Sequence, residues 1–187
     1  MWAEINKALH VVENGGLILY PTDTIWGIGC DALNGEAIHK VYHLKQRDDA
    51  KSLIILLAEA KDIFHYVANP HPDIISIIHS FERPTTVIYE QAIGLPDNLR
   101  NADGSIAIRV TKDPFSKSLI KKMKRPLVST SANISGSPSP ENFDAVAKEI
   151  KDGVDYIVNH RRDEKENPPS SRILKINADG SFTVIRA

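Results

Sequence analysis

The sequence predicts a single α/β (α+β) domain in which a mixed β-sheet packs against flanking helices. The chain has 187 residues, 42% of them hydrophobic and 25% charged, which is the composition of one globular domain with a sizeable core. Runs typical of strands alternate irregularly with helix-period segments, which favours a mixed sheet over a regular doubly wound one. No internal repeat is present, so one domain is expected over residues 1–187.

The elements of the first half follow from hydrophobic periodicity. Apolar residues recur at helical spacing from Trp2 to Val12, and the Gly15-Gly16 pair then ends the pattern, which predicts an opening amphipathic helix. The next expected elements are a strand at 17–20, a loop rich in Thr and Gly at 21–31, a helix at 36–44, a buried strand at 52–57 and a short buried helix at 74–78.

The second half is expected to supply most of the sheet. Strands are predicted at 85–89, 105–110, 126–131, 172–176 and 182–185, with an Asp179-Gly180 turn between the last two. Pro114 is expected to open a helix that ends near residue 124, and the Ser139-Pro140 pair to begin a helix over 141–150. The charged segment 161–169 ends in two prolines and is predicted to be an exposed, mobile loop.

Charge and cysteine content narrow the class of protein. With 23 Lys and Arg against 24 Asp and Glu, the chain is not basic as dedicated nucleic-acid binders usually are, so RNA contact would need a local patch or a partner. The single cysteine, Cys30, cannot form an internal disulfide, which suits a reducing cytoplasm. No apolar run approaches a membrane span and no signal peptide is visible, so a cytoplasmic protein without membrane association is expected. The seven histidines form no metal-binding motif, so no protein-built metal site is expected.

A row of small polar side chains follows a predicted strand. In an extended chain Ser129, Ser131 and Asn133 point the same way, at the end of a strand, where ligands often bind in α/β folds. Ser139, at a predicted helix N-terminus, would add a phosphate contact. The alternative interpretation is a plain polar turn between a strand and a helix.

Two sets of cations have the chemistry of anion binding. Period-two alternation puts Ser105 and Arg109 on one strand face, and a guanidinium suits a carboxylate or a phosphate, although an arginine on a solvent-facing sheet is the alternative. Lys45 and Arg47 would share a face only if the preceding helix stops near Leu44. Otherwise these two cations, with Lys51 behind them, are simply favourable near a helix C-terminus.

Two further patterns are weaker. Thr22 and Thr24 would point together in an extended chain, and Gly27-x-Gly29 permits close backbone approach, yet neither a dinucleotide fingerprint nor a Walker motif is present. Five cations in and after the expected helix at 114–124 form either a patch for RNA or acidic surfaces or an ordinary solvated helix face.

Together these stretches resemble the YrdC/Sua5 family. Residues 21–32, Pro-Thr-Asp-Thr-Ile-Trp-Gly-Ile-Gly-Cys-Asp-Ala, are similar to its opening signature, and Lys45-x-Arg47 and Ser131-x-Asn133 resemble its paired motifs. Residues 107–110 and 126–136 match further blocks in the same order, so the resemblance runs from about residue 8 to the C-terminus. The sequence departs from the family at Arg83-Pro-Thr-Thr86 and at Asp48.

The resemblance implies a YrdC-like twisted mixed sheet with a concave, positively lined cavity. It implies a nucleotidyltransferase, L-threonylcarbamoyladenylate synthase, that joins L-threonine, bicarbonate or CO2, and ATP and releases pyrophosphate. ATP would bring Mg²⁺ through its phosphates. The product would pass to a tRNA threonylcarbamoyl-transferase complex that forms N6-threonylcarbamoyladenosine (t6A), with weak tRNA or RNA binding as a further expectation. The alternatives are a paralogue that binds RNA or nucleotide without synthesis, and a carbamoyl-transfer module of a larger hydrogenase-maturation protein.

The resemblance also implies roles for individual residues. The side chains expected to contact threonine are Thr24, Arg109, Ser129 and Ser171. Those expected to contact ATP are Arg47, Lys51, Ser105, Ser131, Ser139 and Arg186. The catalytic set expected near the triphosphate is Lys45, Arg47, Ser131 and Asn133.

Overall fold

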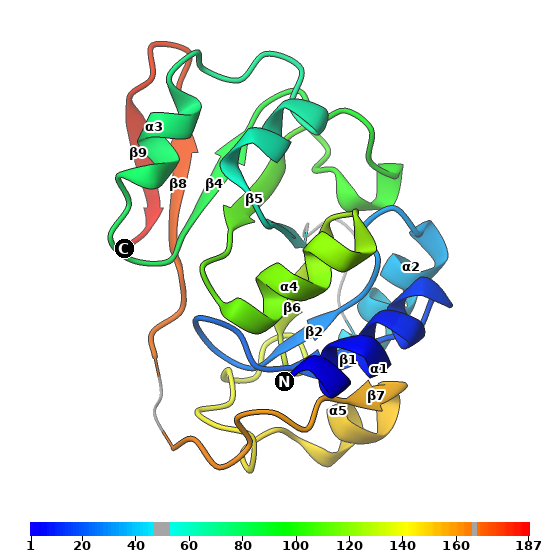
Figure 1. Ribbon diagram of the computed structural model, residues 1–187. Helices are drawn as coiled ribbons and strands as arrows, with labels where there is room; N and C mark the ends of the chain where they lie inside the picture. The colour runs from blue at the N-terminus through cyan, green and yellow to red at the C-terminus, as the bar shows by residue number, and fades with distance from the viewer. Residues whose placement is uncertain (47–52, 166–167) are drawn as a thin grey trace.

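The protein is built on one twisted sheet. The computed structural model in Figure 1 describes residues 1–46, 53–165 and 168–187. In that part of the chain nine strands lie in the order β7-β1-β2-β6-β3-β5-β4-β8-β9. The strands are β1 (Ile18–Tyr20), β2 (Gly27–Gly29), β3 (Ile54–Leu57), β4 (Thr85–Tyr89), β5 (Ile106–Val110), β6 (Leu127–Ser131), β7 (Tyr156–Ile157), β8 (Arg172–Ile176) and β9 (Phe182–Arg186). Because parallel and antiparallel pairs both occur, the expected mixed sheet is confirmed.

The helices divide between the two faces of the sheet. They are α1 (Trp2–Glu13), α2 (Gly35–Lys45), α3 (Ile74–His79), α4 (Pro114–Met123) and α5 (Lys148–Gly153), with short 3-10 turns η1 (Ala60–His65) and η2 (Asp97–Leu99). Successive strand residues join different apolar clusters: Ile55 packs with α2, η1 and α3, whereas Leu56 packs with α1 and α4. Since side chains alternate between the faces of a strand, the two clusters lie on opposite sides of the sheet.

The face that carries α1 and α4 is only partly covered. Arg109 pairs in register with Leu56, and Ala107 pairs with Ile54 and Ile88, so these side chains share that face. The cluster under α1 and α4 includes Leu56 but no residue of β4, β5 or β8. This part of the face, where polar side chains appear, is where the candidate site lies.

The strand β2 was not predicted. β2 lies inside the segment expected to be a loop, because two glycines and few β-branched residues hide the signal of a strand. A Cβ on Gly29 would come within 2.8 Å of the Tyr20 ring and 3.0 Å of the Val128 carbonyl oxygen. Gly29 is therefore explained by the packing of β2 between β1 and β6.

The prediction of a helix over 141–150 is wrong for most of its length. α5 begins only at Lys148, and the residues before it form turns and bends. The Asn142 side chain accepts a hydrogen bond from the Ala145 backbone N–H at 3.2 Å, which competes with a helix, and the Phe143 ring packs 4.9 Å from the Trp26 ring. Tertiary packing thus overrides local propensity, and Ser139 does not stand at a helix N-terminus. The short strand β7 was also not predicted.

The other predicted elements are found within one or two residues of their expected bounds, apart from Ser52, which lies outside the described residues. Residues 161–165 form a bend, a turn and irregular chain, as expected of a loop. They are not uniformly exposed, however, because the first two arginines of the loop are half-buried.

Candidate functional site

A cavity of about 290 Å³ lies on the open part of the sheet face, bordered by the Thr-rich loop after β1 and the segment before β8. Its lining includes Ala107 and Ile88 on the sheet floor. Seven of the residues expected to contact threonine or ATP line it: Thr24, Arg109, Ser129, Ser131, Ser139, Ser171 and Arg186. All four residues expected to contact threonine are thus brought together in one cavity.

Arg109 is a buried cation of this cavity, only 3% exposed, so it is not an arginine on a solvent-facing sheet. One terminal nitrogen donates to Thr24 Oγ1 at 3.3 Å, and the other lies 3.1 Å from Asp23 Oδ1. Its Nε is buried without a hydrogen-bond partner in the described part of the chain. A buried donor without an acceptor costs free energy, so Arg109 is well placed to bind an anionic ligand.

The loop that carries Thr24 is organised by Thr22. The two threonine hydroxyls lie 3.0 Å apart, Thr22 Oγ1 donates to the Ile25 carbonyl at 2.8 Å, and it accepts from the Thr24 N–H at 3.0 Å. The expectation that both threonines point together is confirmed. Sequence analysis gave Asp23 no role, because alternation along an extended chain would place it opposite the two threonines, and no local signal pointed to its contact with Arg109.

The opposite side of the cavity is closed by Ser171 and Arg186. Arg186 donates to the Ser171 carbonyl at 2.7 and 3.1 Å, and the Ser171 hydroxyl lies 2.9 Å from that of buried Thr86. Burial, with repulsion from Arg109, lowers the pKa of the Arg186 guanidinium. An anion bound beside Arg186 would favour its charged form, which burial and the neighbouring Arg109 disfavour. The sequence marked Thr86 only as part of the departure from the family pattern at Arg83-Pro-Thr-Thr86.

The row of polar side chains on β6 is only partly as expected. Ser129 and Ser131 line the cavity, but Asn133 does not. The Asn133 amide donates to the backbone carbonyls of Ile134 at 3.0 Å and Ser137 at 2.7 Å, so it holds the turn after β6. The interpretation as a polar turn therefore applies to Asn133, while the two serines face the cavity.

Lys45 is buried at the C-terminal end of α2, where it holds backbone rather than lining the cavity. It is the last residue of α2, and Gln46 then ends the helix in the left-handed region with φ 49°. Lys45 is 1% exposed, and its ammonium donates to the backbone carbonyls of Ser131 and Asn133, the latter at 2.6 Å. It lies outside the cavity lining and ties α2 to the turn after β6. The predicted roles of Arg47 and Lys51 fall on residues outside the described part of the chain.

Ser105 is not part of the cavity lining. It is buried in the turn before β5, where its hydroxyl donates to Asp103 Oδ1 at 2.6 Å and its N–H donates to the same atom at 3.0 Å. These contacts form a local Asx turn that begins the strand. A role of Ser105 in ATP contact remains a prediction.

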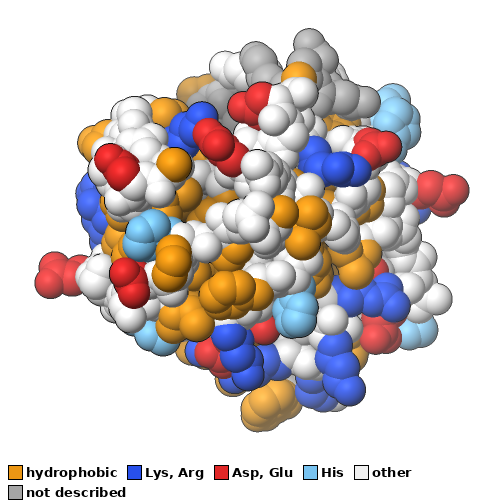
Figure 2. Space-filling model, turned by 90° about the horizontal axis from the view of Figure 1, so that it is seen from above, with side chains coloured by type: hydrophobic (Ala, Val, Ile, Leu, Met, Phe, Trp, Pro, Cys, Tyr) orange, Lys and Arg blue, Asp and Glu red, His pale blue; other side chains and the backbone are white. Residues whose placement is uncertain are grey.

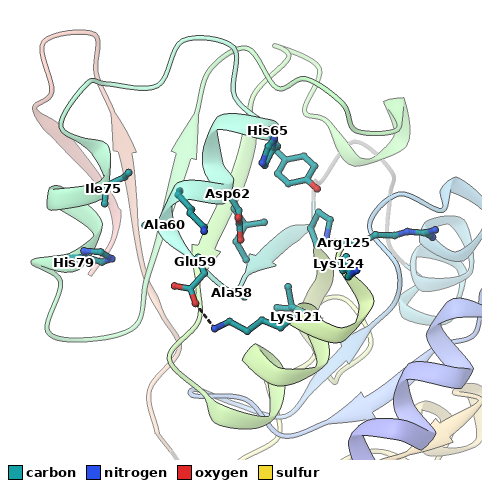
Figure 3. A pocket seen from close by; sticks show the side chains of 15 residues that line it. Ala58, Glu59, Ala60, Asp62, His65, Ile75, His79, Lys121, Lys124 and Arg125 are labelled. Atoms are coloured by element: carbon teal, nitrogen blue, oxygen red, sulfur yellow. Dashed lines mark ion pairs between the residues drawn. The ribbon is translucent and has the colours of Figure 1, made fainter.

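A second cavity, of about 710 Å³, lies between α3, η1 and the C-terminal end of α4, and Figure 3 shows it from close by. None of the residues expected to bind threonine or ATP lines it. Two of its cations pair with carboxylates of the protein: Lys121 lies 2.6 Å from Glu59, as Figure 3 shows, and Arg125 lies 2.7 Å from Asp31. Figure 2 shows acidic and basic side chains interspersed around apolar ones on the face seen from above. The described residues of that face form no continuous basic surface for RNA.

Neither a metal centre nor a membrane span is evident in the described part of the chain. No group of three or more His, Cys, Asp or Glu side chains lies close enough to hold a metal ion, and no helix is long and apolar enough to cross a membrane.

The family follows from comparison with known proteins. The model of the family Sua5/YciO/YrdC, described as "Telomere recombination", matches residues 10–187. The chain belongs to this family. A family member from Idiomarina loihiensis, named threonylcarbamoyl-AMP synthase, is 31% identical over 169 residues, covering 89% of this chain and 91% of the relative. A putative threonylcarbamoyl-AMP synthase from Methanocaldococcus jannaschii is 36% identical over 174 residues, covering 92% and 80%.

Solved family structures share the fold. P. abyssi Sua5 complexed with L-threonine matches with a TM-score of 0.81 at 23% identity, over 91% of this chain and 50% of that protein. E. coli YciO matches with a TM-score of 0.79 at 20% identity, over 97% and 87%. The chain thus spans about half of P. abyssi Sua5 and most of YciO, and it has the twisted mixed sheet of both.

Proposed function

We propose that the chain is an L-threonylcarbamoyladenylate synthase, a nucleotidyltransferase that uses L-threonine, bicarbonate or CO2, and ATP, and releases pyrophosphate. The observation that carries the proposal is the meeting of Arg109 and Arg186 with the hydroxyls of Thr24, Ser129 and Ser171 around one cavity. The curated relatives named threonylcarbamoyl-AMP synthase support it, because they match nearly the whole chain.

The cavity suits a small amino acid with a hydroxyl group. The α-carboxylate of threonine would bind Arg109, whose fork can replace a weak contact to Thr24 by a charge-assisted one. The hydroxyls of Thr24, Ser129 and Ser171 would satisfy the ligand's ammonium and hydroxyl groups. Such a site rejects analogues that lack the hydroxyl, because its buried polar groups would be left unpaired, whereas serine is harder to exclude.

ATP would lie along the side of the cavity lined by Ser131 and Ser139. Arg186 would neutralise phosphate there, joined by Arg47 and Lys51, and Ser105 stays a predicted contact. Lys45 and Asn133 would contribute by fixing the backbone at Ser131, through the hydrogen bonds that they donate to the turn after β6.

Mg²⁺ would arrive with ATP as part of the substrate. The residues described offer no carboxylate cluster to hold the ion by themselves, and a phosphate-bound Mg²⁺ keeps several of its waters and needs few protein ligands. The ion would neutralise phosphate charge, while the arginines and serines of the chain orient the phosphates.

The reaction requires positioning more than a nucleophilic side chain. The threonine amine attacks CO2 and loses a proton, which gives a carbamate. A carbamate oxygen then attacks the α-phosphorus of ATP, and the bond to pyrophosphate breaks. Fixed donors and cations stabilise the charge that develops. The only cysteine, Cys30, takes no part, since burial, with the neighbouring Asp31, raises the pKa of its thiol.

The proposed setting is a single domain over 1–187 in the cytoplasm, with the product passed to the tRNA threonylcarbamoyl-transferase complex that forms t6A. Direct tRNA or RNA contact would be weak, as the formal net charge of −1 suggests.

The test is pyrophosphate release from ATP, Mg²⁺ and bicarbonate, measured with and without L-threonine. Release that depends on threonine is expected, together with t6A formation when an active partner complex and tRNA are added. A matched control is Arg125→Ala, which removes a cation paired with Asp31 outside the cavity and should leave the rate unchanged. No threonine-dependent release, combined with salt-dependent RNA binding, would instead support the paralogue that binds RNA without synthesis.

A further inference from the structure

Arg161, which lies outside the cavity lining, has an unusual backbone and a well-anchored side chain. Its φ is 59°, in the left-handed region that residues other than glycine rarely adopt. Gln46, Lys124 and Gln91 share this conformation; the first two end helices, where it is common, and Gln91 lies in the bend after β4. Arg161 ends no helix, so other interactions must hold its backbone there.

The Arg161 guanidinium joins three segments. One terminal nitrogen donates to the Thr22 carbonyl and to Asp113 Oδ1, each at 3.1 Å. Nε donates to Glu164 at 2.8 and 2.9 Å within the same turn. The side chain is 29% exposed, so these bonds are partly shielded from water.

The anchor on α4 is rigid. Asp113 is the N-cap of α4, its side chain is 3% exposed, and its other carboxylate oxygen accepts from the Ser116 N–H and hydroxyl, both at 2.7 Å. Asp113 would therefore keep hydrogen-bond partners if Arg161 were removed, and the helix would keep its cap. The other end of the connection, the Thr22 carbonyl, belongs to the residue whose hydroxyl orients Thr24.

We propose that Arg161 is a positioning residue for the threonine end of the site, an inference that rests on the proposed function. It fixes Thr22 against α4, Thr22 in turn orients Thr24, and Thr24 accepts from Arg109. Arg161 thereby sets the geometry of the hydroxyl and guanidinium that meet threonine, without touching the ligand.

The test compares Arg161→Gly with Arg162→Ala. Glycine removes the side chain and relieves the left-handed backbone, so the fold should persist. Arg162 is a matched control because it bonds the backbone carbonyls of Ile157 and Val158, away from Thr22. We expect Arg161→Gly to raise the KM for threonine about tenfold, with kcat and the KM for ATP changed less than about threefold. Arg162→Ala should leave the KM for threonine unchanged, and Arg161→Lys should restore part of the loss.

An unchanged KM for threonine in Arg161→Gly would overturn the proposal, as would an equal rise in both KM values with a lowered Tm. Wild-type protein in the same assay separates this result from failure of the proposed function, which would show as no threonine-dependent activity at all. Amide hydrogen exchange gives a readout that needs no activity. Arg161→Gly should speed exchange in residues 22–26 but not in β5, and equal protection in both proteins would contradict the positioning role.

Discussion

The two ends of the cavity use their polar side chains in different ways. At the threonine end, Arg109 borders the cavity beside Thr24 and keeps a buried Nε with no hydrogen-bond partner among the described residues. At the nucleotide end, Lys45 and Asn133 direct their donors to backbone carbonyls. The threonine end therefore suits an anionic ligand, whereas Lys45 and Asn133 at the nucleotide end hold the backbone of the turn after β6.

This difference shows that a motif resemblance does not by itself give a residue's role. Lys45-x-Arg47 and Ser131-x-Asn133 were grouped as catalytic, yet only Ser131 among their described members lines the cavity. A cation can serve a site by binding the ligand or by fixing the backbone that binds it. Substitutions at the two ends should therefore change different quantities.

Arg109→Ala should have the largest effect. It removes the guanidinium and leaves the carboxylate of Asp23, 14% exposed, without its ion-pair partner. We expect the KM for threonine to rise roughly 100-fold, equivalent to about 3 kcal/mol. The KM of Arg109→Lys for threonine should fall between those of Arg109→Ala and the wild type, because lysine restores the charge without the planar guanidinium. Steady-state pyrophosphate release measures both, and a KM within threefold of wild type in Arg109→Ala would remove Arg109 from the threonine site.

Lys45→Met should act mainly on stability. Two backbone carbonyls lose a charged donor inside the protein, which should cost about 3 kcal/mol of unfolding free energy, or roughly 10 °C in Tm. Lys40→Met is the matched control, since Lys40 is an exposed lysine of the same helix α2, and its ammonium donates to the Gly15 carbonyl after α1. Calorimetry should show the loss only in Lys45→Met. A normal Tm with abolished synthesis would instead make Lys45 a direct catalytic group.

Glu4, which does not line the cavity, gives a reference for both ends. Its burial alone would raise the pKa, but hydrogen bonds from Tyr156 and the Asn159 N–H, with Lys7 nearby, outweigh burial and lower the pKa from 4.5 to about 2. The stabilisation is therefore complete above pH 4.5 and is lost as the pH falls toward 2. Glu4→Gln should lose about 2 kcal/mol at pH 7, and urea unfolding should show this deficit shrinking below pH 4.5. A deficit independent of pH would contradict the charged hydrogen bonds.

Thr86→Val should have the smallest effect, confined to the threonine end. It removes the hydroxyl that lies 2.9 Å from that of Ser171 while keeping the shape of a buried side chain. The KM for threonine should rise about fivefold, or roughly 1 kcal/mol. Thr85→Val, whose hydroxyl donates to the Arg83 carbonyl, serves as the control. Equal effects of the two variants would indicate a loss of packing only.

Local patterns predicted most of the fold. Period-two runs at 85–89 and 105–110 and the helical period from Trp2 to Val12 all report burial of one face, and each element was found. The failures lie where local signals and packing disagree. Two glycines weaken the strand signal of β2. The helix predicted at 141–150 does not form over most of its length, because Phe143 packs on Trp26 instead. Sequence could not reveal either outcome, because the partner strands and rings come from distant parts of the chain.

The sequence by itself determined which chemical groups the chain carries. Period-two alternation placed the Arg109 guanidinium on one face of its strand, and the threonines and serines of the other motifs supplied hydroxyls. Tertiary structure alone decided which of these groups meet. The register of β5 beside β3 brings Arg109 over the sheet face left open by α4, and the Thr-rich loop brings Thr24 to it. The ammonium of Lys45 was drawn instead to buried carbonyls. A side chain's role depends on the donors and acceptors that folding places around it, and no local spacing records them.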